Sequence, residues 1–454
     1  MKLELISPFR KGPRNVGNAF HFPQMALGIL ASLTPSDVDV SITDELVQPI
    51  DLEKEVDLVG ITVNTKTAVR AYEIADAYRS RGVSVVLGGI HPTVAKEEAL
   101  MHASTLVLGE AEDVWSTLLE DFKNGKLKKL YRSDKLPNPK HIPHPRRQLF
   151  QEHRYVSVNL VQTSRGCPYS CDFCSVSSLY GNGVRLRPVD SVIAEVKHLS
   201  GNKLMFVDDN IVAVREHSKQ LLGRLASLNK KWIGQTSINV ADDDKMLKRL
   251  NRGGCLGLFV GLETTSTEGL KTVGKYQNIN NDYIESVKKL HDNGIAVLGA
   301  FILGLDSDDE SCFDRLLEFS LKSKIDVIQP SILAPYPATA IYSRLKEENR
   351  LIDDSWWLRY NADDVVYRPN RMTRVQLYEG WVRTMKELYK LRFALKRCLD
   401  GFSKRSLFGN ILNWKGNMGY RKLAYAKSEK SPGRSPARHV DYSVESHVHV
   451  DVSH

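Results

Sequence analysis

Residues 163–175 read TSRGCPYSCDFCS and hold three of the six cysteines of this 454-residue chain. Cys167, Cys171 and Cys174 have the spacing C-x3-C-x2-C, and an alternating apolar stretch, VSVNLVQTS, comes directly before them. A disulfide needs two thiols and a structural zinc site needs four ligands. Neither Cys255 nor any histidine lies at metal-ligand spacing from the group. We therefore favour a 4Fe–4S cluster, which three thiolates hold while one iron stays open to an outside ligand, and zinc is the alternative.

The bulk composition is that of a globular protein. The chain is 42% hydrophobic and 26% charged, and its length predicts two or three domains. The other cysteines lie far apart, which excludes a disulfide scaffold and favours a reducing, cytoplasmic setting. The first residues, MKLE, do not start a secretory signal, and the longest apolar run, at 294–305, is too short to span a bilayer. We expect a cytoplasmic protein that is not integral to a membrane.

Two series of alternating strand and helix patterns organise the α/β chain. Residues 1–125 predict a doubly wound, Rossmann-like parallel sheet, 126–157 a proline-rich linker without regular elements, and 158–340 a partial TIM-like barrel of six βα units. Residues 341–427 predict a mostly helical segment, and 428–454 a disordered tail. In both kinds of sheet, ligands bind past the carboxyl ends of the strands. The strands predicted for the barrel are 156–164, 203–209, 232–240, 255–263, 295–304 and 326–333.

The cysteine spacing, the aromatic Phe173 before the last cysteine and the six βα units resemble radical S-adenosylmethionine (radical SAM) enzymes. The resemblance implies that Cys167, Cys171 and Cys174 hold the cluster, that its open iron binds SAM and that Phe173 lies beside the cofactor. It further implies reductive cleavage of SAM to a 5′-deoxyadenosyl radical, with an electron donor such as a flavodoxin or ferredoxin.

Polar residues at the ends of the next barrel strands resemble SAM-contacting positions of that family. Asp208 and Asp209 match the region that contacts the methionine amino group, and a helix N-cap is the alternative. Ser237 and Asn239 match the ribose-contacting position. Glu263 matches a further ligand-contacting carboxylate, and capping of the next helix is its alternative.

The N-terminal segment resembles cobalamin-binding domains fused ahead of radical SAM barrels, through PQMALGILASL, VDLVGITVNT, VVLGGIHPT and LVLGEAE. In that family, paired glycines, here Gly88 and Gly89, border the nucleotide tail of cobalamin. Thr62 and Thr65 are candidates for hydrogen bonds to that tail, and hydroxyls that face water are the alternative. The cobalt-ligating D-x-H-x-x-G motif is absent, which leaves a domain that keeps the fold without the cofactor as an alternative.

Together the domains resemble cobalamin-dependent radical SAM methyltransferases over about residues 2–400. This implies transfer of a methyl group from SAM, via methylcobalamin, to an unactivated carbon. Oxidative cyclisation or rearrangement by an enzyme of the same architecture is the alternative. Methylthiotransferases carry three further cysteines in their first domain, and residues 1–166 contain none.

The C-terminal part guides the substrate prediction. The segment 353–369 and the basic helices after it resemble those of enzymes that act on lipids and tetrapyrroles, including hopanoid methylases, so we expect a lipid (hopanoid- or isoprenoid-like) substrate. Between 383 and 438, fifteen Lys and Arg stand against three Asp and Glu. The apolar and basic mixture at 401–422 suits peripheral contact with an anionic membrane, and a helix packed on the barrel is the alternative. A basic, non-catalytic nucleic-acid-binding protein is the alternative of another class, but no groove-reading module is recognisable and we expect no nucleic-acid partner.

Overall fold

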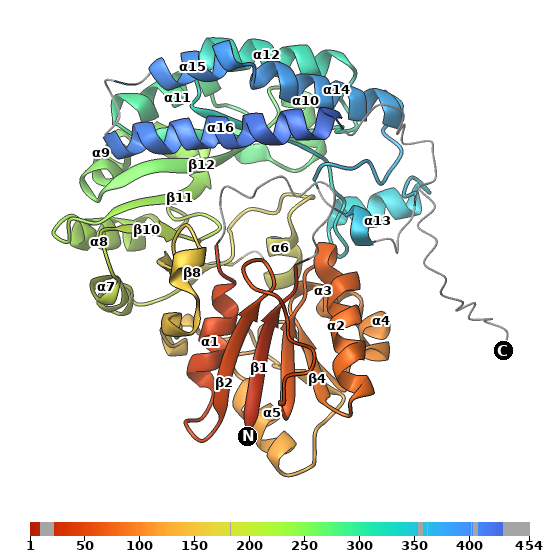
Figure 1. Ribbon diagram of the computed structural model, residues 1–454. Helices are drawn as coiled ribbons and strands as arrows, with labels where there is room; N and C mark the ends of the chain where they lie inside the picture. Colours follow the sequence, from red (N-terminus) through yellow and green to blue (C-terminus); the bar gives the residue numbers. More distant parts are fainter. Residues whose placement is uncertain are drawn as a thin grey trace.

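Two parallel sheets, each with its own helices, make up the molecule (Figure 1). The N-terminal sheet lies below the second sheet in this view, and the C-terminal helices cover the second sheet from above. Among the described residues, no helix combines the length and the apolarity needed to cross a bilayer. The computed structural model describes residues 1–9, 22–181, 183–352, 357–360, 362–400, 402 and 407–429.

The first sheet is entirely parallel, with the strand order β2-β1-β3-β4-β5-β6. Strands β1, β3 and β4 are buried almost throughout because helices cover both faces. This burial explains the mainly apolar runs of β3 and β4, whereas β1 also buries the charged Glu4. This is the predicted doubly wound fold. The strands are β1 (Lys2–Ser7), β2 (Asp39–Asp44), β3 (Leu58–Thr62), β4 (Ser84–Gly88), β5 (Thr105–Leu108) and β6 (Leu130–Arg132).

Two separate cores hold the helices of this domain to the two faces of its sheet. Leu5 packs with α1 and α5, whereas its neighbour Ile6 packs with α2, because successive strand residues point to opposite faces. Trp115, at the start of α5, is one of the largest fully buried side chains. The helices are α1 (Met25–Leu33), α2 (Ala68–Ser80), α3 (Ile90–Val94), α4 (Lys96–Met101) and α5 (Trp115–Lys123).

The stretch 126–157 contains more regular structure than the sequence predicts. It supplies the edge strand β6 and three short 3₁₀ helices, Pro139–His141, Arg147–Leu149 and Glu152–Arg154. The expectation that prolines exclude every regular element here is wrong, because the first of them, Pro137, comes after β6.

The second sheet is the predicted partial barrel of six parallel strands, in the order β14-β13-β12-β11-β10-β7, with β14 and β7 at its edges. The antiparallel pair β8 (Ser164–Arg165) and β9 (Arg185–Leu186) follows β7 and brackets the cysteines. The barrel strands are β7 (Leu160–Val161), β10 (Lys203–Phe206), β11 (Lys231–Ser237), β12 (Cys255–Glu263), β13 (Ala296–Leu303) and β14 (Val327–Ile332).

Helices alternate with and follow the strands of the partial barrel. Those of the βα units are α6 (Ser175–Tyr180), α7 (Val189–His198), α8 (Arg215–Leu225), α9 (Asp244–Arg252), α10 (Thr267–Thr272), α11 (Tyr283–Asp292), α12 (Ser311–Ser323) and α13 (Ala340–Glu347). The C-terminal helices are α14 (Arg374–Leu388), α15 (Leu391–Leu399) and α16 (Leu407–Glu429).

Helix α16 packs on the barrel, against β12, β14, α14 and α15. Its buried Asn413 and Asn417 donate hydrogen bonds to the Asp326 carboxylate (3.1 Å) and carbonyl (3.0 Å) just before β14. For this side of α16, residues 407–422 are therefore part of a helix packed on the barrel, which was the alternative to membrane contact. Of the predicted tail, residues 428 and 429 end α16 and 430–454 lie outside the described residues.

Candidate functional site

The three cysteines lie at the carboxyl end of the second sheet, between β8 and α6. Cys171 is buried, Cys167 and Cys174 are half-buried, and all three are free thiols. The Cys174 N–H donates to the Cys171 carbonyl (3.0 Å), which closes the loop into a tight turn at the start of α6. Burial raises the pKa of the Cys167 and Cys171 thiols, so bound iron would have to displace their protons.

The donor set fits an iron–sulfur cluster better than a single metal ion. Within the part of the chain that the structure describes, no three His, Cys, Asp or Glu side chains converge on one metal position. A tetrahedral zinc ion requires such convergence of four ligands. Each thiolate of a cubane binds a different iron, so three thiols spread around one loop suit a cluster.

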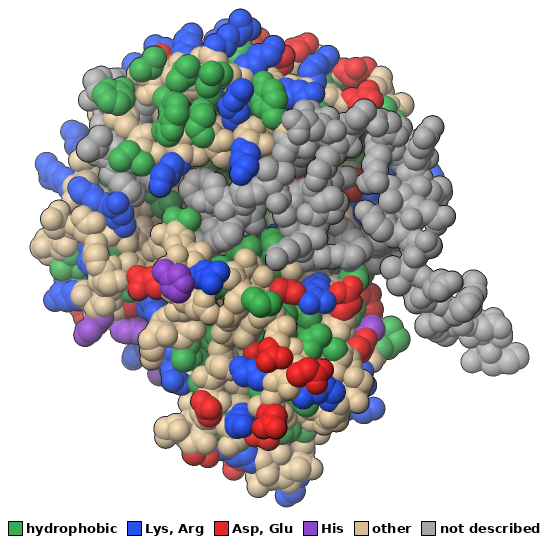
Figure 2. Space-filling model, viewed as in Figure 1, with side chains coloured by type: hydrophobic (Ala, Val, Ile, Leu, Met, Phe, Trp, Pro, Cys, Tyr) green, Lys and Arg blue, Asp and Glu red, His purple; other side chains and the backbone are tan. Residues whose placement is uncertain are grey.

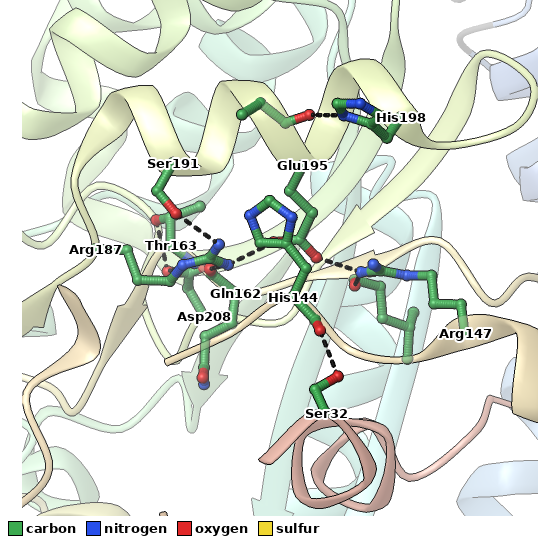
Figure 3. A network of polar contacts seen from close by, with 12 residues as sticks. Ser32, His144, Arg147, Gln162, Thr163, Arg187, Ser191, Glu195, His198 and Asp208 are labelled. Atoms are coloured by element: carbon green, nitrogen blue, oxygen red, sulfur yellow. Dashed lines mark hydrogen bonds and ion pairs between the residues drawn. The ribbon is translucent and has the colours of Figure 1, made fainter. Parts of the chain in front are cut away.

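Asp208 holds the start of the cysteine loop (Figure 3). Its fully buried carboxylate accepts hydrogen bonds from Thr163 Oγ1 (2.7 Å), Ser164 Oγ (2.6 Å) and the Thr163 N–H (3.1 Å). Burial raises its pKa, and the Ser164 and Thr163 donors oppose this shift. The carboxylate therefore engages the cysteine loop from within the protein, and its contact with the methionine amino group stays a prediction. Asp209 accepts from the Gly166 N–H (3.1 Å), beside Cys167, and its SAM contact stays a prediction.

The end of β11 also contacts the cysteine loop. Asn239 Nδ2 donates to the hydroxyl of Tyr169, which lies between the first two cysteines (2.9 Å). Ser237 ends β11 and is buried. Both residues thus lie at the edge of the sheet where the sequence predicts them, and their contact with a ribose stays a prediction.

Glu263 forms a buried ion pair with Lys275, a residue that the sequence reasoning did not identify. The Glu263 Oε1–Lys275 Nζ distance is 2.8 Å, and Lys275 Nζ lies 5.8 Å from the centroid of the Phe173 ring. Burial lowers the pKa of Lys275, but the charges of Glu263 and of the cysteines outweigh it and the pKa is raised. Gln277 Nε2 donates to Cys171 Sγ (3.6 Å), so one short segment after α10 lies against the loop.

The helix-cap alternative for Glu263 does not apply. The N-cap of α10 is Ser266, whose side chain accepts from the Gly269 N–H (3.2 Å). Glu263 itself has a positive φ of 65°, at the point where the register between β12 and β13 shifts. This strained conformation turns its carboxylate toward Lys275.

The residues predicted to contact cobalamin gather at the carboxyl edge of the first sheet. Thr62 ends β3, Thr65 is buried in the next turn, and Gly88 ends β4. Gly89 has a φ of 106°, and a Cβ there would lie 2.7 Å from the Val63 carbonyl oxygen. Packing against β3 is enough to require this glycine, and the cobalamin contacts of all four residues stay predictions.

Two N-terminal histidines, His91 and His102, contact other side chains of the protein. His91 is fully buried beneath the ring of Trp357 (centroids 5.0 Å apart), and its Nε2 lies 3.5 Å from Glu98. Trp357 Nε1 donates to both Glu98 oxygens (2.9 and 2.8 Å), so the C-terminal segment packs on the first domain. His102 pairs with a carboxylate of α2, and His21 lies outside the described residues.

The carboxyl edges of the two sheets meet at the cysteine loop. Glu110 and Glu112, just after β5, form ion pairs with Arg165 of the loop (3.1 and 2.6 Å). Nothing in the spacing of these residues predicts the contact, because it joins positions more than fifty residues apart. A ligand at the edge of the first sheet would therefore face a cluster held by the second.

Comparisons with known proteins agree with this geometry. Residues 161–320 match the radical SAM superfamily, 26–119 the B12 binding domain, and 339–410 a domain of unknown function, DUF4070. The bacteriochlorophyllide d C-12(1)-methyltransferase of Chlorobaculum tepidum is 30% identical to this chain, over 85% of each protein. The chain belongs to the cobalamin-dependent radical SAM methyltransferase family. The cofactors of this family member are a 4Fe–4S cluster, SAM and cobalamin.

Two further relatives illustrate the family. The hopanoid C-2 methylase of Rhodopseudomonas palustris is 26% identical, over 74% of this chain and 66% of its own. The methyltransferase TsrM from Kitasatospora setae, solved with cobalamin and a [4Fe–4S] cluster, has the same fold, with a TM-score of 0.65 at 16% identity. That alignment covers 94% of this family member and 99% of TsrM.

Proposed function

We propose that this enzyme methylates an unactivated carbon of a large, mainly apolar molecule, a polycyclic lipid or a tetrapyrrole. The single observation that carries the proposal is the contact of the cysteine loop with the end of β5, through Arg165 and its two glutamates. A methyl transfer that uses both cofactors requires their sites to face one another across such a contact.

The residues around the loop suit the two cofactors. When bound, the cluster supplies the electron that cleaves SAM, and cobalamin carries the methyl group. Cys167, Cys171 and Cys174 would hold the cluster. Glu263 and Lys275 form a buried pair of opposite charges, 2.8 Å apart, which matches the ammonium and carboxylate groups of the methionine part of SAM. Phe173 would line the apolar side of that pocket.

The substrate class rests on the relatives and on the C-terminal segment. One relative is named for a bacteriochlorophyllide and another for a hopanoid. Both molecules are polycyclic and largely apolar. The proposed substrate class therefore includes the lipid expected from the sequence as well as a tetrapyrrole. A flavodoxin or ferredoxin is the proposed electron donor.

The test is an anaerobic reaction of the reconstituted enzyme with a reductant, cobalamin and SAM that carries a deuterated methyl group. A hopanoid and bacteriochlorophyllide d are offered separately, and the products are weighed by mass spectrometry. Methyl transfer adds the labelled methyl group to one of them. A product that has only lost hydrogens would instead establish the oxidative cyclisation alternative, and no labelled product from either substrate would contradict the proposed substrate class.

Exposed apolar side chains support the proposed peripheral membrane contact. Leu391, Leu395 and Leu399 are exposed at four-residue spacing on one face of α15. Figure 2 shows hydrophobic side chains over these C-terminal helices, with lysine and arginine side chains around them. Such a mixture suits an anionic lipid surface. Further exposed apolar residues nearby in the chain are Phe402, Ile411 and Trp414. Of the stretch 401–422, the side chains of Leu407, Phe408 and Leu412 lie outside the description.

Vesicle flotation tests this contact. The protein should float with phosphatidylglycerol vesicles more than with phosphatidylcholine vesicles, and replacing the three α15 leucines by serine should abolish the difference. Leu321→Ser, at an exposed position of α12, is the matched control and should float like the wild type. Unchanged flotation of the triple variant would rule out α15 as the membrane-binding face.

A further inference from the structure

Four charged side chains form a closed cluster at the contact between the two sheets. Arg165 lies 3.1 Å from Glu110 and 2.6 Å from Glu112, and Arg185 binds both oxygens of Glu110 (2.8 and 2.5 Å). The two arginines belong to the antiparallel pair β8 and β9, which brackets the cysteines, and they are direct partners in its register. The two glutamates follow β5 of the cobalamin-binding domain. We call these four residues the interdomain clamp.

The clamp is shielded from water and its charges balance. The four side chains expose between 8 and 19% of their surface, and two positive charges face two negative ones. Further hydrogen bonds fix the arginines: Arg165 Nε donates to Gln162 Oε1 (2.8 Å) and Arg185 Nη1 to the Pro137 carbonyl (2.7 Å). Loss of one partner would leave a buried charge without its counterion, and lysine cannot reproduce the planar, forked geometry of arginine.

The clamp lies close in the chain to the first cysteine, so its position affects the position of the cysteine loop. Arg165 lies two residues before the first cysteine, and Gly166 between them has a φ of 89°. A Cβ on Gly166 would lie 2.2 Å from the Gly183 carbonyl oxygen, so the backbone there has little room to move. A displacement of Glu110 or Glu112 would therefore move Arg165, and with it the cysteine loop that begins two residues later.

We propose that the interdomain clamp sets the separation between cobalamin and the cluster, with Arg165 as its central positioning residue. Without Arg165 each domain keeps its own core and its own cofactor, but the distance between the cofactors is no longer fixed. The clamp acts through position alone and takes no part in electron or proton transfer.

The test compares Arg165→Gln with the wild type after reconstitution with the cluster and cobalamin. The main readout is the magnetic interaction between cob(II)alamin and the reduced cluster in pulsed electron paramagnetic resonance, which depends on their distance. We expect unchanged iron and cobalamin contents, a broader distance distribution and a weaker mean interaction. Arg224→Gln, in an exposed ion pair with Asp190 on the barrel surface, is the matched control and should leave the interaction unchanged.

Three further variants keep the proposal falsifiable if Arg165→Gln does not fold. Glu112→Gln approaches the same ion pair from the other domain, away from the cysteines, and should broaden the distances in the same way. The double variant R165E/E112R, which exchanges the two charges, should show a narrower distribution of cobalamin–cluster distances than R165E alone. A wild-type interaction in either single glutamine variant would overturn the proposal. Loss of iron in Arg165→Gln with an unchanged interaction in Glu112→Gln would also overturn it, because Arg165 would then serve the cluster alone.

Discussion

Glu195→Gln should strongly destabilise the protein, because it removes the charge that two largely buried arginines share. Glu195 lies on α7 with only 2% of its side chain exposed, between Arg147 and Arg187 (Figure 3). Arg187 Nη1 donates to one carboxylate oxygen (2.6 Å) and Arg147 Nη2 to the other. Glutamine keeps the volume but removes the charge, so two largely buried guanidinium groups lose their counterion.

The magnitude follows from the burial of this cluster. Breaking a buried ion pair costs about 3–5 kcal/mol. Both arginines keep hydrogen bonds to backbone carbonyls, Arg147 to Val158 (3.1 Å) and Arg187 to Gln162 (2.8 Å), which places the expected loss near the lower limit, about 3 kcal/mol. With a urea dependence of about 3 kcal/mol per molar, the unfolding midpoint of the barrel should fall by about 1 M.

The measurement is urea unfolding of the metal-free protein, followed by circular dichroism and tryptophan fluorescence. Glu216→Gln is the matched control, since Glu216 is exposed and its pairing with Lys219 at 3.5 Å contributes less than about 0.5 kcal/mol. If Glu195→Gln shifts the midpoint no further than Glu216→Gln does, the charge of Glu195 does not stabilise this part of the fold and the reasoning fails.

Three other changes have definite expected outcomes. Gly89→Ala should lower the free energy of unfolding by about 1–3 kcal/mol, because Gly89 has a positive φ and a Cβ there would press on the Val63 carbonyl oxygen. Gly88→Ala is the control and should leave the free energy of unfolding nearly unchanged. Equal urea midpoints for the two variants would contradict this. Burial raises the pKa of Asp308 to about 6, above that of the unfolded carboxyl, so this group destabilises the fold as the pH rises from about 4 through 6. Between pH 4 and 7 the free energy of unfolding of Asp308→Asn should therefore rise by about 3 kcal/mol relative to that of the wild type. If the free energies of unfolding of the two metal-free proteins change in parallel with pH, the pKa of Asp308 is not raised. Replacing all three loop cysteines by alanine should abolish iron binding and cluster absorption after anaerobic reconstitution, and surviving absorption would exclude them as the cluster ligands.

The order of elements was predictable because each element is encoded locally. Buried parallel strands are short apolar runs, and the helices between them show their own period, so the five main strands of the first sheet and the six of the second could be located. The short strand β6 was not, because its three residues, LYR, carry no such pattern and pair only at an edge. The three cysteines could be predicted as cluster ligands because their spacing is itself the signal of such a site.

The sequence by itself therefore determined the two kinds of α/β fold, and it predicted the cluster ligands and the edge of each sheet at which the cofactors bind. Only the tertiary structure decided which side chains lie at that edge. Asp208 turns into the protein to hold Thr163 and Ser164, whereas Lys275, in a segment without any motif, lies beside the loop. The contact of Arg165 with Glu112 likewise depends on how the two sheets meet. Burial and ion pairing are properties of neighbours in space, and a pattern along the chain specifies them only where those neighbours are also close in sequence.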